Sequence, residues 1–154
     1  MTKRNPSPAD RAAETIAGEC LAVRVRMLNR TITAIYDDAL RPLGLTTGQL
    51  NILVVVTKRG PLSPGEVARR LNMEKSTVSR NVERMRANGW LTVTASSSGR
   101  KQQLTLTRQG KRLLEESVPA WDQAQTRTRA LLGQRGSDSI RSLGNAVWSR
   151  MGIA

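Results

Sequence analysis

Residues 62–107 constrain the fold of this chain most, because two helical patterns are followed directly by two alternating strand patterns. Ser63, Pro64 and Glu66 are typical of a helix start: a capping serine, a proline at the first helical position and a glutamate that completes a capping box. A second helix is predicted over residues 74–88, because its apolar residues recur at helical spacing. These apolar residues are Met73, Val78, Val82 and Met85.

Two strands are expected after the second helix. Leu91 and Val93 alternate with threonines, and Leu104 and Leu106 alternate with polar residues, so the two segments are expected to pair around a polar tip. A short third strand is expected at residues 61–62. Helix, turn, helix and hairpin in this order predict a winged helix-turn-helix within a mainly α (α+β) fold.

The polar face of the second helix is the candidate functional surface. It carries Lys75, Ser76, Thr77, Ser79, Arg80 and Arg84. Such a face suits a major groove, where hydroxyls and arginines reach base edges while other arginines meet phosphates. Arg100 and Lys101, at the expected hairpin tip, are placed to reach a neighbouring groove or the DNA backbone.

Positive charge is concentrated in the same part of the chain. Residues 58–112 hold 13 basic residues and three acidic ones, a difference of +10, while the whole chain carries +13. Charged faces of ordinary helices are often only solvated, but this concentration favours a polyanionic partner, namely double-stranded DNA. A membrane partner is not expected, because no run of about 18 apolar residues exists.

The chain before the winged module is expected to contain a flexible tail at residues 1–9 and one long helix over residues 10–40. This helix has apolar residues on two sides, so both sides need to be covered. One side can pack on its own domain, and the other requires a further helix or a second subunit. We therefore interpret residues 10–40 as a dimerisation helix that precedes a winged DNA-binding module over residues 45–107.

The C-terminal part, residues 108–154, is expected to hold two further helices. The first is capped by Thr107 and bends at Pro119, and two glycines separate it from a last helix that Ser137 caps. The last helix has an apolar face that a compact winged module does not cover, so this part is also interpreted as dimerising. Residues 10–154 then form a single domain.

Catalysis is not expected, because the chain has no histidine and therefore lacks the common general base and the ligand of most zinc sites. No glycine-rich phosphate loop is present either. We therefore expect no enzyme activity, no cofactor and no metal. A single cysteine, Cys20, rules out an internal disulfide, and the N-terminus lacks the apolar core of a secretory signal, so a cytoplasmic location is expected.

Four short motifs follow one another along the chain. They are Leu45-Thr46-x-x-Gln49; Met73-Glu74-Lys75-Ser76-Thr77-Val78-Ser79-Arg80; Gly89-Trp90-Leu91; and Gly99-Arg100 followed by Leu104-x-Leu106-Thr107-x-x-Gly110. Their combination resembles the MarR family of bacterial transcriptional regulators over nearly all of residues 14–152. The resemblance implies a homodimeric repressor whose two recognition helices enter successive major grooves of a pseudo-palindromic operator.

The resemblance also implies a small aromatic or phenolic effector, bound between the dimerisation helices and the winged module, that releases the DNA. Arg24, Met27 and Trp121 are candidate effector contacts by position. Other members of the family sense oxidants through a cysteine near the first helix, and Cys20 lies close to that place. Its position in an apolar stripe favours a structural role, because free cysteine is usually buried.

Two positions depart from the family pattern. At position 98 the family's wing usually has an aspartate that holds the wing arginine in place. This chain has Ser98 there, so Arg100 is expected to be less pre-organised. Trp90 replaces a more common aliphatic residue and is interpreted as core filling. One alternative function is a basic architectural protein that coats DNA without sequence choice. Another is an RNA-binding module, which the scarcity of aromatic residues disfavours.

Overall fold

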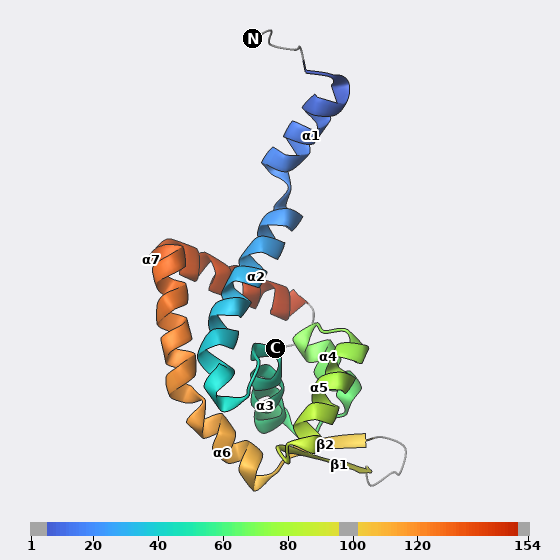
Figure 1. Cartoon of the computed structure of the whole chain (residues 1–154). Helices are drawn as coiled ribbons and strands as arrows, with labels where there is room; N and C mark the ends of the chain where they lie inside the picture. The colour runs from blue at the N-terminus through green and yellow to red at the C-terminus, as the bar shows by residue number, and fades with distance from the viewer. Residues whose placement is uncertain (1–5, 96–101, 151–154) are drawn as a thin grey trace. The chain divides into compact units, whose positions relative to one another are not determined.

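The computed structural model describes residues 6–95 and 102–150 (Figure 1). The chain divides into two compact units, with the boundary between Ala34 and Ile35. The first unit contains α1 (Pro8–Glu19) and the beginning of α2 (Leu21–Leu40). The second unit contains the end of α2 and all later elements.

A break at Cys20 separates the two helices of the first unit. Ser7 caps the start of α1, and Cys20 ends it with an extended backbone (φ −65°, ψ 105°). The Arg24 guanidinium donates hydrogen bonds to main-chain oxygens at the break, to Cys20 at 3.0 Å and also to Gly18. Gly18 weakens the helix near the break, because glycine has a low helix propensity. The Arg24 side chain satisfies main-chain carbonyls that the end of α1 leaves without a helical partner. The prediction of one continuous helix over residues 10–40 was therefore wrong.

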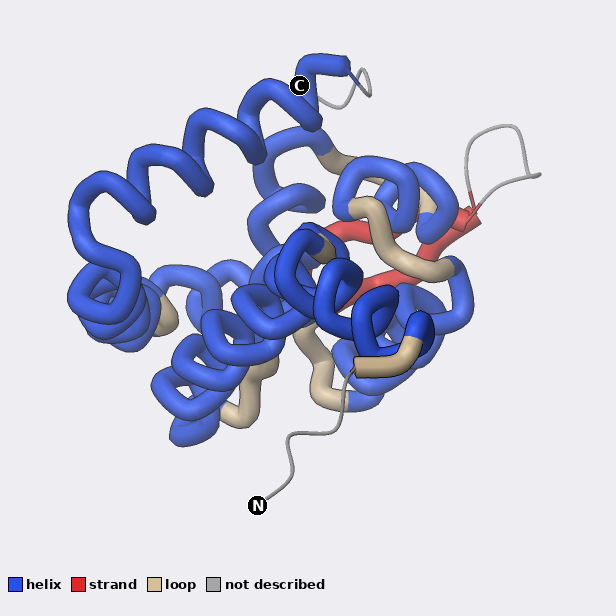
Figure 2. The backbone as a smooth tube through the Cα atoms, turned by 90° about the horizontal axis from the view of Figure 1, so that it is seen from above, coloured by secondary structure: helices blue, strands red, loops and turns tan. Residues whose placement is uncertain are grey.

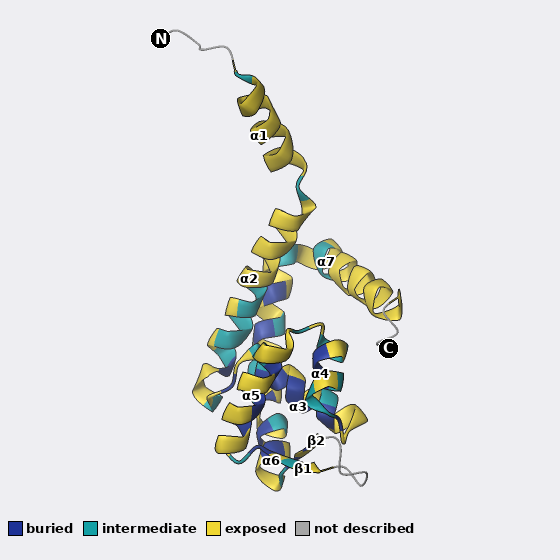
Figure 3. Cartoon of the chain, turned by 90° about the vertical axis from the view of Figure 1, so that its right-hand side faces the viewer, coloured by how far each residue is buried: buried dark blue, intermediate teal, exposed yellow. Residues whose placement is uncertain are grey.

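The core of the second unit lies between three helices and a hairpin. Helices α3 (Thr47–Arg59), α4 (Pro64–Leu71) and α5 (Lys75–Ala87) pack with the antiparallel strands β1 (Leu91–Ala95) and β2 (Gln102–Leu106), as Figures 1 and 2 show. The largest fully buried apolar side chains are Leu40, Ile52, Leu53, Met85, Leu91, Leu104, Val67 and Val78. Figure 3 shows buried residues gathered on these elements. The predicted winged helix-turn-helix is confirmed.

The hairpin has the predicted register. Leu91 pairs with Leu106 and Val93 with Leu104, so the apolar residues of both strands lie on the face that covers the helices. The Leu104 amide also donates to the Leu62 carbonyl at 2.8 Å. This isolated bridge lies where a third strand was expected, but it forms no strand, and the described sheet has two strands. Trp90, just before β1, is buried in the core, which confirms its interpretation as core filling.

Ser63 caps α4 as predicted. Its hydroxyl accepts the Glu66 amide at 3.3 Å, and the Glu66 carboxylate accepts the Ser63 amide at 2.8 Å. Replacing Ser63 by alanine is expected to lower the free energy of unfolding by about 1 kcal/mol, because α4 loses its capping box. Urea denaturation measures this loss. Ser79→Ala, on the exposed side of α5, is the matched control and should leave stability unchanged or slightly higher.

The breaks in the C-terminal helices agree with the prediction only in part. Helix α6 (Arg108–Glu116) ends at Ser117, two residues before Pro119. Pro119 lies in the first turn of α7 (Val118–Arg150). Proline costs no hydrogen bond there, because the first amides of a helix have no helical partner. Gly133 interrupts α7 with φ 66° and ψ 172°, as expected of one of the two glycines. The prediction of a cap at Ser137 was wrong, because its hydroxyl donates to the Gly133 carbonyl at 2.9 Å within continuing helix.

No single helix in the described part of the chain is long and apolar enough to span a membrane. One pair of helical segments passes the same test together, by length and composition only. The pair consists of residues Leu21–Leu43 and Thr47–Arg59, and it is bent by 78°.

Candidate nucleic-acid interface

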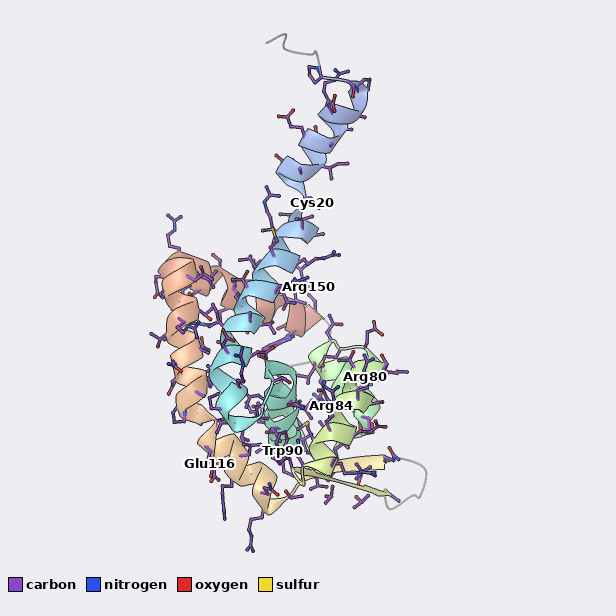
Figure 4. The ribbon with its side chains drawn as sticks, in the orientation of Figure 1. Cys20, Arg80, Arg84, Trp90, Glu116 and Arg150 are labelled. Carbon is purple, nitrogen blue, oxygen red and sulfur yellow. The ribbon has the colours of Figure 1, made fainter. Side chains whose placement is uncertain are left out.

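Helix α5 presents the predicted polar face outward. Lys75, Ser76, Ser79, Arg80 and Arg84 are exposed, and Thr77 is half-buried. Figure 4 shows Arg80 and Arg84 on this helix, one turn apart. The opposite side of α5 is fully occupied by packing, because Val78 and Met85 are 0% exposed and Val82 is 6% exposed. The structure thus brings all six predicted α5 residues onto one helix whose orientation the core determines.

The two arginines are available for a ligand. Neither forms an ion pair within the described residues, where the ion pairs are Arg41 with Asp38 and Arg141 with Asp138. Arg80 makes one weak contact, a 3.4 Å hydrogen bond from Nη2 to the Thr77 hydroxyl. A guanidinium without a fixed intramolecular partner can donate its N–H groups to guanine or phosphate oxygens.

The turn that leads into α5 is tightly built. Asn72 adopts the left-handed conformation (φ 49°) and its amide bonds to carbonyls of Ala68 and Arg69, while the Met73 amide bonds to the Ala68 carbonyl at 2.9 Å. These bonds close the end of α4 in the manner of a Schellman-type cap. The first turn of α5 is therefore held at a defined distance from α4.

A shallow groove of about 450 Å³ runs between α4 and the start of α5. Its walls include Arg69 on one side and Lys75 and Ser76 on the other. Arg69 was not among the residues predicted for the interface, all of which came from the second helix and the hairpin tip. Arg69 is exposed and lines the same groove as Lys75. If α5 enters a major groove of DNA, Arg69 adds a positive charge beside the DNA backbone.

Not every predicted residue can be placed on this surface from the described part of the chain. Arg100 and Lys101, together with Ser98, lie outside the described residues. Arg24 and Met27 belong to the first unit, where Met27 is 64% exposed, and Trp121 belongs to the second, where it is 39% exposed. Cys20 is not within a helical stripe but at the break between α1 and α2, and it is partly exposed.

Within the described ranges, no three histidine, cysteine, aspartate or glutamate side chains gather closely enough to hold a metal ion.

Comparison with known proteins identifies the family. A sequence model of the MarR family matches residues 43–102, which include the whole helix-turn-helix and β1. The transcriptional regulator MosR of Mycobacterium tuberculosis has 33% sequence identity with this chain. Its crystal structure superimposes with a TM-score of 0.72, over 85% of this chain and 97% of that one. The chain belongs to the MarR family.

Three further comparisons place this MarR-family chain among regulators. The crystal structure of MosR in complex with DNA matches with 34% identity and a TM-score of 0.71, over 85% of this chain and 98% of that one. BpsR of Bordetella bronchiseptica, a protein whose DNA binding is regulated by 6-hydroxynicotinic acid, matches with 26% identity and a TM-score of 0.72, over 84% and 95%. The uncharacterised HTH-type regulator YwoH of Bacillus subtilis (strain 168) is 30% identical over 87 residues, which are 56% of this chain and 64% of YwoH. The named relatives are regulators rather than enzymes.

Proposed function

We propose that this MarR-family protein is a transcriptional regulator that binds a specific duplex DNA sequence, and that it acts as a repressor in the cytoplasm. The observation that carries the proposal is the exposed α5 face. Hydroxyl groups lie in its first turn, and two arginines follow on the same side of a helix that packs on the core. Neither arginine forms an ion pair with another described residue. This combination suits base reading as well as phosphate binding.

We further propose that the protein binds DNA as a homodimer, with one α5 in each of two successive major grooves of a pseudo-palindromic operator. Exposed apolar side chains outside the winged module support this. In the first unit they are Ile16, Leu21, Val23, Val25, Met27 and Leu28, and in α7 they are Leu131, Ile140, Leu143, Val147 and Trp148. Monomeric soluble proteins rarely expose so many large apolar residues on neighbouring helical turns.

The proposed regulator also responds to a small aromatic effector. The support is the regulation of BpsR by 6-hydroxynicotinic acid, together with the resemblance that made Arg24, Met27 and Trp121 candidate contacts. Oxidant sensing through Cys20 is the alternative within the same family. A peroxide titration of operator binding, compared between the parent and Cys20→Ser, distinguishes the two kinds of signal.

A selection experiment tests the main proposal. Duplexes bound at about 150 mM salt are selected from a random DNA pool, and the stoichiometry is determined on the winning sequence. We expect an inverted repeat with half-sites about 10 base pairs apart, bound by one dimer. A pool without any enriched sequence, with affinity that falls steeply in salt, would instead indicate an architectural protein, which the net charge of +13 also suits.

Arg100→Ala is expected to weaken binding to all sequences by a similar factor and to lower the salt dependence of the binding constant by about one phosphate contact. The reason is that Arg100, which lies between the two strands in the sequence, is expected to bind the DNA backbone. Binding constants for the selected operator and for a scrambled duplex, measured over a salt series, test this. A change of preference at one base pair alone would mean that the wing reads bases.

A further inference from the structure

One threonine joins the end of α5 to the start of α6. Thr107 is the N-cap residue of α6, and its hydroxyl accepts the Gly110 amide at 3.0 Å. The same hydroxyl donates its proton to the main-chain carbonyl of Gly89 at 2.6 Å. Gly89 lies two residues after the last residue of α5. A hydroxyl has one proton and two lone pairs, so it can bond to both helix ends at once.

The main chains of the two helix ends also lie close together. Gly89 has a left-handed backbone (φ 73°), and the Trp90 amide donates to the Met85 carbonyl at 2.9 Å, which closes the end of α5. The Trp90 carbonyl accepts the Thr107 amide at 3.1 Å. A Cβ added to Gly110 would stand 2.1 Å from the same carbonyl oxygen. We call Gly89, Trp90, Thr107 and Gly110 the α5–α6 joint.

The angle between α5 and α6 depends on this joint. Helix α6 also packs on the core through Leu113, which belongs to the same cluster as Val78 and Met85 of α5. Apolar packing has no preferred direction, whereas a hydrogen bond weakens steeply as its angle departs from linear. The Thr107 hydroxyl therefore restricts the angle between the two helices more than the Leu113 contact does.

This angle matters for reading DNA. Helix α5 and the winged module turn together, because α5 packs on the core, while α6 leads into α7, which carries part of the proposed dimer surface. Helix α5 has 13 residues, so its first turn lies about 20 Å from the joint. A tilt of about 10° at the joint moves that first turn by about 3.5 Å, close to the rise of one base pair.

We propose that Thr107 is a positioning residue that sets the distance between the two recognition helices of the dimer, and thereby the half-site spacing that the protein accepts. Thr107 acts through α5 and needs no contact with DNA itself. This role rests on the proposed function, because it requires a dimer on an operator with two half-sites.

Thr107→Asp tests the proposal, because it separates the two hydrogen bonds of the hydroxyl. A carboxylate still accepts the Gly110 amide and caps α6, but it has no proton to donate to the Gly89 carbonyl. Fluorescence anisotropy compares the selected operator with operators whose half-site spacing is one base pair longer or shorter. We expect the parent to prefer the selected spacing by at least about tenfold, and Thr107→Asp to prefer it by about threefold or less.

Thr46→Asp is the matched control. Thr46 caps α3, where its hydroxyl accepts the Gln49 amide at 3.3 Å, so an aspartate can take its place. It lowers the net charge by the same amount and should keep the spacing preference of the parent. Thr107→Ser retains the hydroxyl and should also behave like the parent. An isolated half-site should bind Thr107→Asp and Thr46→Asp equally, because neither changes the outward face of α5.

If Thr107→Asp does not fold, as judged by circular dichroism, Thr107→Val replaces it with the same expected loss of spacing preference. The proposal is overturned if the Thr107 variant discriminates between spacings as the parent does, or if Thr46→Asp loses discrimination equally. Failure of the proposed function looks different, because the parent itself would then show no preferred sequence or spacing, and the role of Thr107 would fall with it.

Discussion

Replacing Arg80 by alanine is expected to weaken operator binding by about 1–3 kcal/mol and to relax base preference at one position of each half-site. Arg80 is exposed on α5, and its only hydrogen bond within the described chain is the 3.4 Å contact to the Thr77 hydroxyl. Little intramolecular bonding is therefore lost when the guanidinium turns to a base. Fluorescence anisotropy with the selected operator and with single-base variants of it measures both effects.

Arg127→Ala is the charge-matched control for this prediction. Arg127 is an exposed arginine of α7, outside the helix-turn-helix, so its removal lowers the net charge by the same amount without touching α5. We expect a small, sequence-independent loss of affinity in this control. If Arg80→Ala behaved like Arg127→Ala, the assignment of base reading to Arg80 would be wrong.

Replacing Gly110 by alanine is expected to destabilise the fold by about 1–3 kcal/mol or more. Gly110 lies in the first turn of α6, where its amide donates to the capping hydroxyl of Thr107 at 3.0 Å. An added Cβ would stand 2.1 Å from the Trp90 carbonyl oxygen, which itself accepts the Thr107 amide. The obstacle is main chain, so no flexible side chain can move aside. This cost exceeds the gain of about 0.5–1 kcal/mol that alanine usually brings to a helix.

Gly65→Ala provides the control, because Gly65 lies in the first turn of α4 and an added Cβ there meets no atom within 4 Å. Its free energy of unfolding should stay equal or rise slightly. Urea denaturation of both variants measures the difference. Equal stability of the two variants would contradict the close approach of α6 to the residue before β1.

The local features of the winged module were predictable from the sequence because their causes are short in range. A capping box needs only residues three apart, as at Ser63 and Glu66, and alternation along two segments determines the register that pairs Leu91 with Leu106. The outward face of α5 followed in the same way, since the spacing of Val78, Val82 and Met85 determines which side is buried.

Predictions for the helices outside the winged module were less accurate, because competing local signals decide where such helices break. The first break lies at Cys20, where Arg24 bonds to free carbonyls, in a stretch whose apolar pattern continues without interruption. The second break lies at Ser117, whose buried hydroxyl donates to the Leu114 carbonyl at 2.7 Å. The sequence indicated Pro119 instead, because proline is the stronger helix-breaking signal.

Only the tertiary structure brings distant residues to one place. Arg70 has the sequence context of an ordinary exposed arginine near a helix end, and Trp148 that of an apolar residue on an amphipathic helix. Folding places both at one pocket, and the buried Arg70 Nε atom has no hydrogen-bond partner among the described residues. The sequence by itself therefore determined the winged module and the outward polar face of α5 through local periodicity. Only the tertiary structure decided that Arg70 and Trp148 line one pocket, because no local pattern records which helices meet.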